Sequence, residues 1–359
     1  MTSWILHVDL DQFLAAVEVL RRPELAGLPV VVGGRGDPTE RAVVSTASYE
    51  AREFGVRSGM PLKTAARRCP EAVFLPVDRP VYEAASETVM ATLRAVPDVT
   101  VQVLGWDEAF VGVDAEEPLE VARRIQADVL AATGLHCSVG LGDTTTRAKI
   151  ATDFGKPRGT YVLTRQNWMA VMGARDTRAL WGIGPRIAAR LAALGIRTVE
   201  DLVHADPDAL VQEFGPTMGP HYARLGRGGG ATRVDPTPWV PRAHGRETTY
   251  QHDLVERGEV VAAVHALAEQ VVEDLRTEGR PCLRVHLKVR FAPFFTTNRS
   301  RKLPEATYDA GTIARTSLEL LDALDDGRPI RLLGVRGEMV PPEGGYEAPT
   351  GDGSGGAPR

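Results

Sequence analysis

The sequence predicts a multidomain α+β protein, and three observations support this prediction. The opening half follows the order strand, helix, hairpin, helix, strand, which is typical of a mostly antiparallel sheet with helices on one face. Residues 166–230 then follow a helical period with short turns. A Gly- and Pro-rich stretch separates them from residues 243–340, where helices alternate with strands. A chain of 359 residues suits about two to four such domains.

The composition is that of an ordinary globular protein, with 43% hydrophobic and 25% charged residues. No stretch approaches the length of a membrane span and no signal peptide precedes Asp9, so we expect a cytoplasmic protein. Cys69, Cys137 and Cys282 are scattered, which argues against a disulfide framework and against a zinc site. The net charge of −5 gives no general case for nucleic-acid binding, so any such case depends on local features.

The first element is an apolar run with strand character, which ends at Asp9 and passes into a helical pattern from Phe13. A carboxylate at the end of a buried strand is well placed to bind a divalent cation. Taken alone, an Asp in this position is more often a simple cap.

A second acidic element lies about a hundred residues further on. Two β-rich runs flank residues 105–108, which predicts a hairpin with Asp107 and Glu108 at its tip. If this hairpin pairs beside the first strand, both carboxylates meet Asp9, and three such groups repel one another unless cations neutralise them. Hard oxygen ligands suit Mg²⁺ rather than Zn²⁺, and such a site suits two-metal phosphoryl or nucleotidyl transfer.

Residues 19–75 are predicted to form a small insert, with strands at 29–32 and 42–46 and helices at 47–54 and 61–68. Tyr49 and Arg52 are three residues apart and share a helix face, where they can hold an anionic ligand. The alternative is a half-buried Tyr beside a solvated Arg. After the hairpin come a helix at 119–132, a strand at 136–141 and a helix with a Thr-rich start from residue 144. Lys156, in the turn that ends this helix, is either a phosphate partner or a solvated lysine.

Two further features indicate contacts with DNA. Gly182 and Gly184 form a Gly-x-Gly turn before a helix, which exposes amide groups that can bind a DNA phosphate without sequence preference. The last domain contains a basic run with no acidic residue in it, which either follows a duplex backbone or is a solvated strand face. Its charged residues are Arg280, Arg284, Lys288, Arg290, Arg299, Arg301 and Lys302.

The order of these motifs resembles that of the Y-family translesion DNA polymerases of the DinB type, over nearly the whole chain. The motifs are Asp9-Leu10-Asp11-x-Phe13, Ser45-Thr46-Ala47-Ser48-Tyr49-Glu50-Ala51-Arg52, Asp107-Glu108-Ala109, Ala148-Lys149-Ile150-Ala151 through Lys156-Pro157, and Gly182-Ile183-Gly184-Pro185. The resemblance implies a right-hand polymerase. Its parts would be a palm (1–18 and 76–166), fingers (19–75), a helix-hairpin-helix thumb (167–230), a linker (231–242), a little finger (243–340) and a disordered tail (341–359).

The same resemblance implies the roles of individual residues. Asp9, Asp107 and Glu108 would bind two Mg²⁺, or Mn²⁺ in their place, with the Leu10 carbonyl as a further ligand. The incoming triphosphate would be held by Ser45 or Thr46, Tyr49, Arg52, Lys156 and the amides of Phe13 and Leu14, with Met60 over the templating base. Primer–template DNA would contact Gly182, Gly184, Arg284, Lys288, Arg290, Arg299, Arg301 and Lys302. The primer 3′-hydroxyl would attack the α-phosphorus in line, and the small fingers imply lesion tolerance with low fidelity.

Three departures from the family pattern have consequences. The family usually has Tyr or Phe at the position of Leu14, where the ring excludes a 2′-hydroxyl, so we expect unusual acceptance of ribonucleotides. The alternative is that Leu14 repacks against Phe13 and discriminates as before. Thr144-Thr145 replaces a common Asn-Lys pair, which puts a phosphate or template contact there in doubt. The tail has no Gln-Leu-x-Leu-Phe-like motif, so docking on a sliding clamp by that route is not expected, and we expect a monomer.

Two other functions remain open from the sequence. Another two-metal palm enzyme, such as a nucleotide cyclase, would share the acidic geometry but would need neither the Gly-x-Gly turn nor the basic domain. A catalytically idle DNA-binding scaffold would keep those two features, but it would not need the acidic residues and the triphosphate set.

Overall fold

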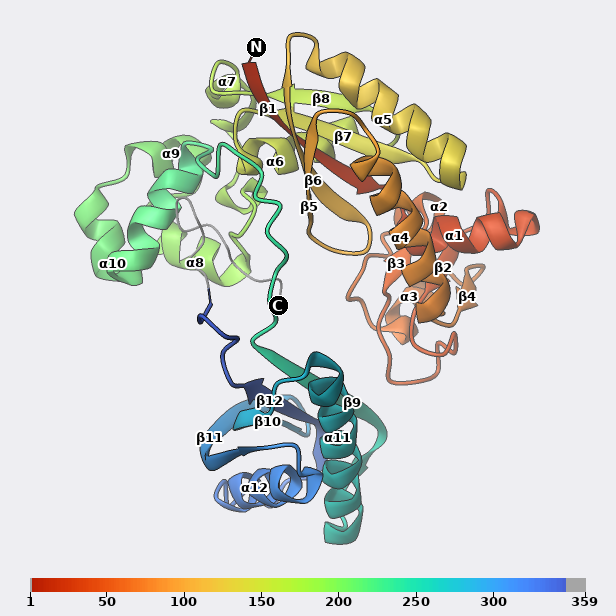
Figure 1. Cartoon of the computed structure of the whole chain (residues 1–359), viewed down its shortest axis with the longest axis vertical. Coiled ribbons are helices and arrows are strands. Elements are labelled where there is room, and N and C mark those ends of the chain that lie inside the picture. Colours follow the sequence, from red (N-terminus) through yellow and green to blue (C-terminus); the bar gives the residue numbers. More distant parts are fainter. Residues whose placement is uncertain (1, 347–359) are drawn as a thin grey trace.

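The computed structural model describes residues 2–346, so the predicted tail from residue 347 onward lies outside the described residues. Figure 1 shows a large upper part built on one sheet, with a small insert on one side and a helical segment on the other, above a separate C-terminal sheet. The described helices include none that is both long enough and apolar enough to cross a membrane.

The upper part is built on a five-stranded sheet in which β1 is central. In sheet order the strands are β5 (Val99–Val103), β6 (Glu108–Ala115), β1 (Thr2–Leu10), β7 (Cys137–Gly142) and β8 (Thr160–Leu163). All neighbours are antiparallel except β7 and β8. This confirms the predicted mostly antiparallel sheet.

Helices cover both faces of this sheet, whereas the sequence predicted helices on one face. The helices α4 (Arg79–Arg94) and α5 (Pro118–Thr133) pack on the face to which Leu6 and Val8 of β1 contribute. The Thr-rich helix α6 (Thr145–Gly155) packs on the opposite face, where Ile5 of β1 meets Ala148. With both faces covered, side chains on both sides of β1 are buried, from Ile5 to Val8.

A glycine in β7 permits the close approach of α6. A Cβ built on Gly140 would lie 2.1 Å from the Ala148 carbonyl oxygen and 2.3 Å from the Thr152 amide nitrogen. Both neighbours are backbone atoms, so a larger residue forces the helix away from the sheet. Since α6 supplies side chains to the acidic cluster described below, this contact also sets the position of that cluster.

We therefore expect Gly140→Ala to lower the free energy of unfolding by about 1–3 kcal/mol, the usual cost of overpacking a tight contact. Gly258→Ala is the matched control, because Gly258 lies in helix α11 and a Cβ there would meet nothing within 4 Å. Alanine at an open helical position stabilises by about 0.5–1 kcal/mol. Thermal unfolding followed by circular dichroism measures both, and equal Tm values for the two variants would contradict the packing argument.

The insert after β1 has its own small sheet and core. It begins with α1 (Phe13–Arg21) and the 3-10 turn η1 (Pro23–Leu25), and continues with β2 (Val30–Val32), β3 (Thr46–Ala47), α2 (Tyr49–Glu53), α3 (Leu62–Arg68) and β4 (Val73–Leu75). The strand predicted at 42–46 is wrong except at Thr46. Residues 42–44 instead bond to 59–62, since the Val44 amide donates to the Met60 carbonyl and the Leu62 amide donates to the Ala42 carbonyl.

The helical segment contains α7 (Trp168–Met172), the 3-10 turn η2 (Thr177–Ala179), α8 (Pro185–Ala193), α9 (Val199–His204) and α10 (Pro207–Gly226). Its end is fastened to the start of α6, because the Thr144 hydroxyl donates to the Gly228 carbonyl and the Thr146 hydroxyl donates to the Gly229 carbonyl. These threonines therefore have a structural role. The following stretch, 231–242, lies against the upper part through the buried side chain of Val234.

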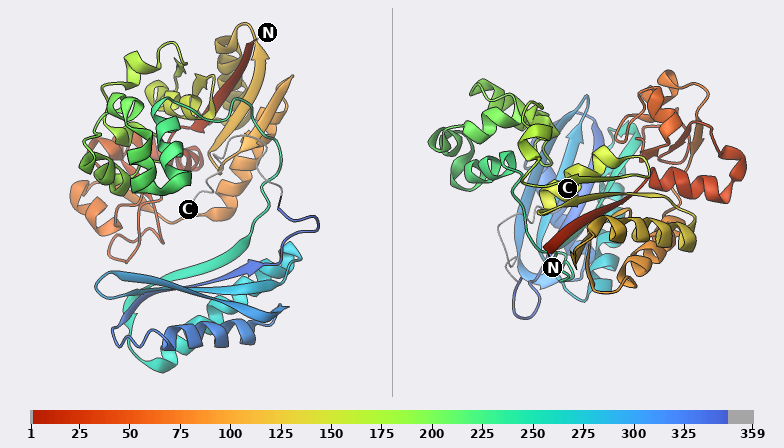
Figure 2. Two further views of the ribbon diagram at one scale, coloured as in Figure 1. Left: turned by 90° about the vertical axis from the view of Figure 1, so that its left-hand side faces the viewer. Right: turned by 90° about the horizontal axis from the view of Figure 1, so that it is seen from above.

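The C-terminal unit is a four-stranded antiparallel sheet with two helices on one face. Its elements are β9 (Ala243–Leu254), α11 (Arg257–Glu278), β10 (Cys282–Phe291), β11 (Phe295–Thr307), α12 (Ala310–Asp322) and β12 (Ile330–Met339), in the sheet order β11-β10-β12-β9. The left view of Figure 2 shows the sheet turned toward the rest of the molecule and the helices on the far side. Arg41 of the insert reaches this unit, where it forms an ion pair with Asp253 and donates its amide hydrogen to the Gln251 side chain.

Candidate active site

The pairing of β1 with β6 brings two of the three predicted carboxylates face to face. Asp9 stands directly opposite Glu108 in the antiparallel register, so both side chains project from the same face of the sheet. The Leu10 amide donates to the Asp107 carbonyl at 2.8 Å, which fixes the residue that precedes Glu108 against the end of β1. The sequence could not supply this register, but its prediction that the hairpin lies beside the first strand is confirmed.

A cluster able to hold a cation forms at this point. Ligand atoms of His7, Asp9 and Glu108 all lie within 4.8 Å of one another. The carboxylate of Asp107 is close enough to act electrostatically on Asp9, but among the described residues it is not part of that group of mutually close ligand atoms. His7 was not among the residues predicted from the sequence. Its position two residues before Asp9 on one strand face was the available signal.

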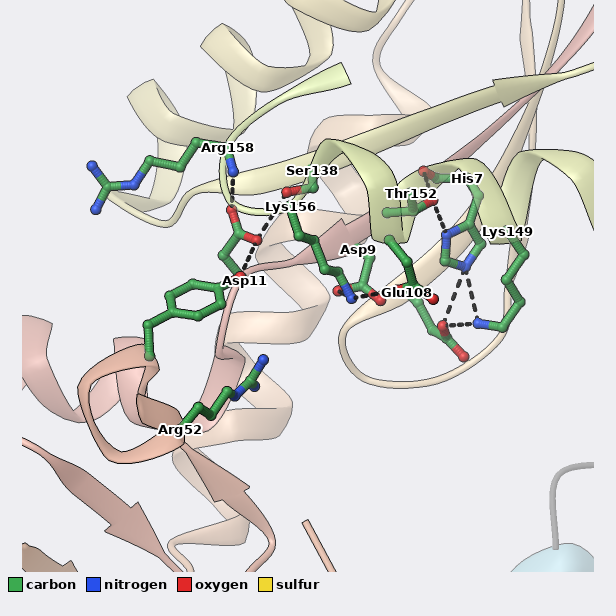
Figure 3. A network of polar contacts seen from close by, with 12 residues as sticks. His7, Asp9, Asp11, Arg52, Glu108, Ser138, Lys149, Thr152, Lys156 and Arg158 are labelled. Carbon is green, nitrogen blue, oxygen red and sulfur yellow. Dashed lines mark hydrogen bonds and ion pairs between the residues drawn. The ribbon is translucent and has the colours of Figure 1, made fainter. Parts of the chain in front are cut away.

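Two lysines partly neutralise the carboxylates, as Figure 3 shows. Lys156 Nζ lies 2.9 Å from Asp9 Oδ1, and Lys149 forms an ion pair with Glu108. Burial raises the pKa of Asp9 above its ordinary value although Lys156 opposes the shift, and burial together with Glu108 raises the pKa of Asp107. The site therefore concentrates negative charge that burial makes costly, which is the condition under which a cation binds well.

The pKa of Glu108 shifts in the opposite direction from those of Asp9 and Asp107, because Glu108 is hydrogen-bonded to the buried side chain of His7. His7 is 1% exposed, and its Nε2 lies 3.1 Å from Glu108 Oε2 while its Nδ1 lies 2.8 Å from Thr152 Oγ1. Burial alone would raise the pKa of Glu108, but the contacts with His7 and Lys149 outweigh it and lower that pKa to about 2. His7 of β1, itself held by Thr152 of α6, therefore helps to keep Glu108 ionised and fixes its orientation.

A second buried carboxylate, Asp11, connects the insert to the main sheet. It accepts hydrogen bonds from the Tyr49 hydroxyl at 2.7 Å, the Ser138 hydroxyl at 2.9 Å and the Arg158 amide at 2.8 Å. Burial, followed by the bond to Asp11, raises the pKa of Tyr49, so its hydroxyl stays protonated and donates. Tyr49 is thus held in one place by a residue that the sequence did not single out.

Of the predicted triphosphate residues, Tyr49 and Arg52 line one open cavity. A cavity of about 790 Å³ is lined by Tyr49 and Arg52 of α2 and by Pro157, the neighbour of Lys156. The Arg52 guanidinium lies 4.9 Å from the centroid of the Tyr49 ring. Phe13 and Leu14 open α1 and are buried, with Leu14 8% exposed. Ser45 is exposed, Thr46 is half-buried in β3, and Met60 is half-buried against the core of the insert.

The Gly-x-Gly turn adopts the expected backbone, although only the single 3-10 turn η2 precedes it rather than a full helix. Gly182 has a φ of 96°, which favours glycine, and Gly184 directly precedes α8. The loop before it meets the acidic cluster, because Trp181 and Arg178 line a cavity of about 170 Å³ together with Asp9.

The register of the C-terminal sheet separates the predicted basic residues into two sets. On β10, the side chains of Arg284, Lys288 and Arg290 alternate with buried apolar residues and lie on the open face, and Lys302 of β11 stands opposite Arg284. Arg299 and Arg301 stand opposite the buried residues Leu287 and Val285, hence on the helix side. Arg301 there forms an ion pair with Glu319 of α12.

Comparisons with known proteins agree with this geometry. Residues 8–153 match the model of the impB/mucB/samB family, and residues 241–347 match that of the impB/mucB/samB family C-terminal domain. The chain is 51% identical to DNA polymerase IV 2 of Mycobacterium tuberculosis (strain ATCC 25618 / H37Rv), over 94% of this chain and 98% of that protein. It is 38% identical to DNA polymerase IV of Methanoculleus marisnigri, over 95% of each.

Solved structures give the same result. A Y-family DNA polymerase chimera of Dbh and Dpo4 superposes with a TM-score of 0.81 at 25% identity, covering 93% of this chain and 98% of that one. An insertion ternary complex of Dbh DNA polymerase superposes with a TM-score of 0.62 at 25% identity, covering 94% and 99%.

Proposed function

The chain belongs to the impB/mucB/samB family and is a DinB-type Y-family DNA polymerase, and on that basis we propose that it performs error-prone translesion synthesis by two-metal nucleotidyl transfer. The observation that supports this most directly is the register that places Asp9 opposite Glu108. We propose that the five-stranded sheet forms the palm and the insert forms the fingers. The helical segment would be the thumb and the C-terminal unit the little finger, within the boundaries given above. The predicted boundary between palm and fingers, at residue 18, falls inside α1.

The donor set of the acidic cluster fits hard divalent cations. Carboxylate oxygens of Asp9 and Glu108 lie close together beside the end of β1, and oxygen ligands of this kind suit Mg²⁺ or Mn²⁺. We propose that Asp9, Asp107, Glu108 and the Leu10 carbonyl bind two such ions. When bound, the ions would activate the primer hydroxyl and stabilise the leaving pyrophosphate.

The side chains around the cluster would bind and orient the two substrates. Lys156 and Arg52 would hold the triphosphate in the cavity beside α2, because a guanidinium and an ammonium both pair well with phosphate. The smaller cavity, between Asp9 and the loop that carries Trp181, lies where a primer end would meet the acidic cluster. Primer–template DNA and nucleoside triphosphates are therefore the proposed partners, and the expectations of a monomer in the cytoplasm stay predictions.

The hydrogen bond between Asp11 and Tyr49 would orient the nucleotide site. We expect Asp11→Asn to raise the KM for the incoming nucleotide by about tenfold with a smaller effect on kcat, since a hydrogen bond to a charged acceptor contributes about 1.5–3 kcal/mol. Ser138→Ala removes another donor to the same carboxylate but leaves Tyr49 bound, so it should change KM much less. Steady-state insertion kinetics measure both variants, and similar KM values for the two would contradict this role of Asp11.

Relaxed sugar selectivity forms the second part of the proposal. Leu14 lies in the first turn of α1, two residues after Gln12, and both Asp11 and Gln12 accept hydrogen bonds from Tyr49. Leu14 is therefore close to the residue proposed to hold the triphosphate. A leucine has no planar ring to exclude a 2′-hydroxyl, so ribonucleotides should be inserted as well as deoxyribonucleotides.

Primer extension on an undamaged template with Mg²⁺ or Mn²⁺ tests the function, with Asp107→Ala as the inactive control. Template-dependent extension by the wild type alone supports the polymerase. Template-free nucleotide turnover would favour the cyclase, and DNA binding without extension would favour the idle scaffold.

A further inference from the structure

The open face of the C-terminal sheet carries two carboxylates among the cations that are proposed to contact DNA. Glu338 of β12 stands directly opposite Arg284 of β10 in the antiparallel register. Glu247 of β9 lies in the same row as Lys288 of β10, with Gly334 of β12 between them. Residues that stand opposite one another project from the same face of a sheet, so both carboxylates belong to the open face.

The glycine in the middle strand lets Glu247 reach across two strands. Lys288 Nζ lies 2.7 Å from Glu247 Oε2. A Cβ built on Gly334 would lie 3.0 Å from the Cβ of Glu247 and 3.4 Å from the Cβ of Lys288. A larger residue at position 334 would therefore crowd both partners, and its absence leaves room for the ion pair.

The second carboxylate contacts two basic side chains of β10. Glu338 Oε2 lies 2.9 Å from His286 Nε2 and 3.6 Å from Arg284 Nε. By contrast, among the described residues Lys302 and Arg336 form no ion pair, although they belong to the same face. The open face therefore contains both free cations and cations that already have a carboxylate partner.

The stability of the fold does not account for these two carboxylates. The side chain of Glu247 is 53% exposed and that of Glu338 is 40% exposed, and ion pairs this exposed add little to stability. A carboxylate on a surface that meets a polyanion also repels it. The main effect of both residues should therefore be on the binding of DNA.

We propose that Glu247 and Glu338 limit the affinity of this sheet for the DNA backbone, because each occupies a cation that would otherwise pair with a phosphate. The two carboxylates thereby speed the release of DNA after an insertion. This inference rests on the proposed polymerase function, because that function makes DNA the polyanion on this face.

The test is equilibrium binding of a fluorescein-labelled primer–template, followed by fluorescence anisotropy from about 50 to 200 mM KCl. Glu247→Gln and Glu338→Gln keep the size of the side chain and remove its charge. Each variant should bind roughly three- to ten-fold more tightly at about 100 mM KCl, since one more cation can release a counterion from DNA. The plot of log Kd against log salt concentration should also become steeper by about 0.9 for each carboxylate removed. We expect the gain to appear as slower dissociation.

Glu319→Gln is the matched control for net charge. It removes the same charge from the same unit, but Glu319 pairs with Arg301 on the helix side of the sheet. This variant should bind DNA like the wild type. A second control is Lys288→Met, in which Glu247 has no cation to occupy, so Glu247→Gln added to it should give little gain.

Four results would overturn the proposal. Unchanged affinity of both Gln variants would show that the carboxylates do not act on DNA. Weaker binding by Glu338→Gln would show that this residue orients Arg284 for a phosphate. Equal tightening by Glu319→Gln would assign the effect to net charge, and a full gain in the Lys288→Met background would separate it from Lys288.

The polymerase function is tested separately, because the binding assay contains no nucleotide. A wild type that binds the primer–template but does not extend it would contradict the proposed function and leave the binding result valid. A wild type without salt-dependent DNA binding would overturn the inference about the two carboxylates.

Discussion

Replacing Asp9 by Asn is expected to slow primer extension by about 10³-fold or more. The substitution keeps the shape of the side chain but removes the charge that would bind the cation, and charge stabilisation by a bound metal contributes several kcal/mol to the transition state. It also weakens the contact with Lys156 Nζ at 2.9 Å, because the amide oxygen that replaces the carboxylate carries no charge. Single-turnover extension at saturating nucleotide and metal measures the effect on the chemical step.

Asp114→Asn is the matched control, because Asp114 lies on the same strand as Glu108 but is exposed at its far end, opposite Ser3. This variant should extend primers at the wild-type rate. Extension by Asp9→Asn within a few-fold of the wild type would show that this carboxylate does not bind the catalytic metal. Thermal unfolding of both variants separates a loss of chemistry from a loss of folded protein.

Leu14→Tyr is expected to restore discrimination against ribonucleotides by roughly 5- to 150-fold. Leu14 is 8% exposed, so a tyrosine ring cannot be fully accommodated where leucine packs, and we expect it to extend toward the proposed nucleotide site beside Tyr49. A 2′-hydroxyl that meets this ring incurs an overpacking cost of about 1–3 kcal/mol, which gives the stated range. The ratio of kcat/KM for deoxyribonucleotide to that for ribonucleotide insertion is the quantity to measure, in wild type and variant.

Leu20→Tyr serves as the control, since Leu20 lies in the last turn of the same helix and is 49% exposed. It should leave the ratio unchanged. Equal discrimination by the wild type and Leu14→Tyr would show that Leu14 does not set sugar selectivity, and that it packs with Phe13 in the manner of the alternative described above.

The parts of the site that could be predicted from the sequence have local signals. The strand that ends at Asp9 and the hairpin with adjacent carboxylates are both visible in short stretches, because strand character and turn residues are local properties. His7 and Asp11 could not be assigned in this way. Their partners Thr152 and Ser138 lie 145 and 127 residues away, and only the packed structure brings them together.

For the basic strands, too, the sequence could not show which residues lie on the same face of the sheet. The run of arginines and lysines was visible as composition, but which of them share a face depends on how β11 pairs with β10 after the turn at 292–294. A shift of one residue would exchange Arg301 and Lys302 between the faces. The sequence likewise did not predict that a helix covers the second face of the main sheet, because the close approach of α6 depends on the absence of a side chain at Gly140.

The apolar cluster under the C-terminal sheet is made of residues from α11, α12 and the four strands of that sheet alone. Mutations on its open face therefore leave the interior that supports the acidic cluster unchanged. A relative's C-terminal unit could therefore be grafted onto this chain without redesigning the interior behind the acidic cluster, and the two parts can change at independent rates in an evolving lineage.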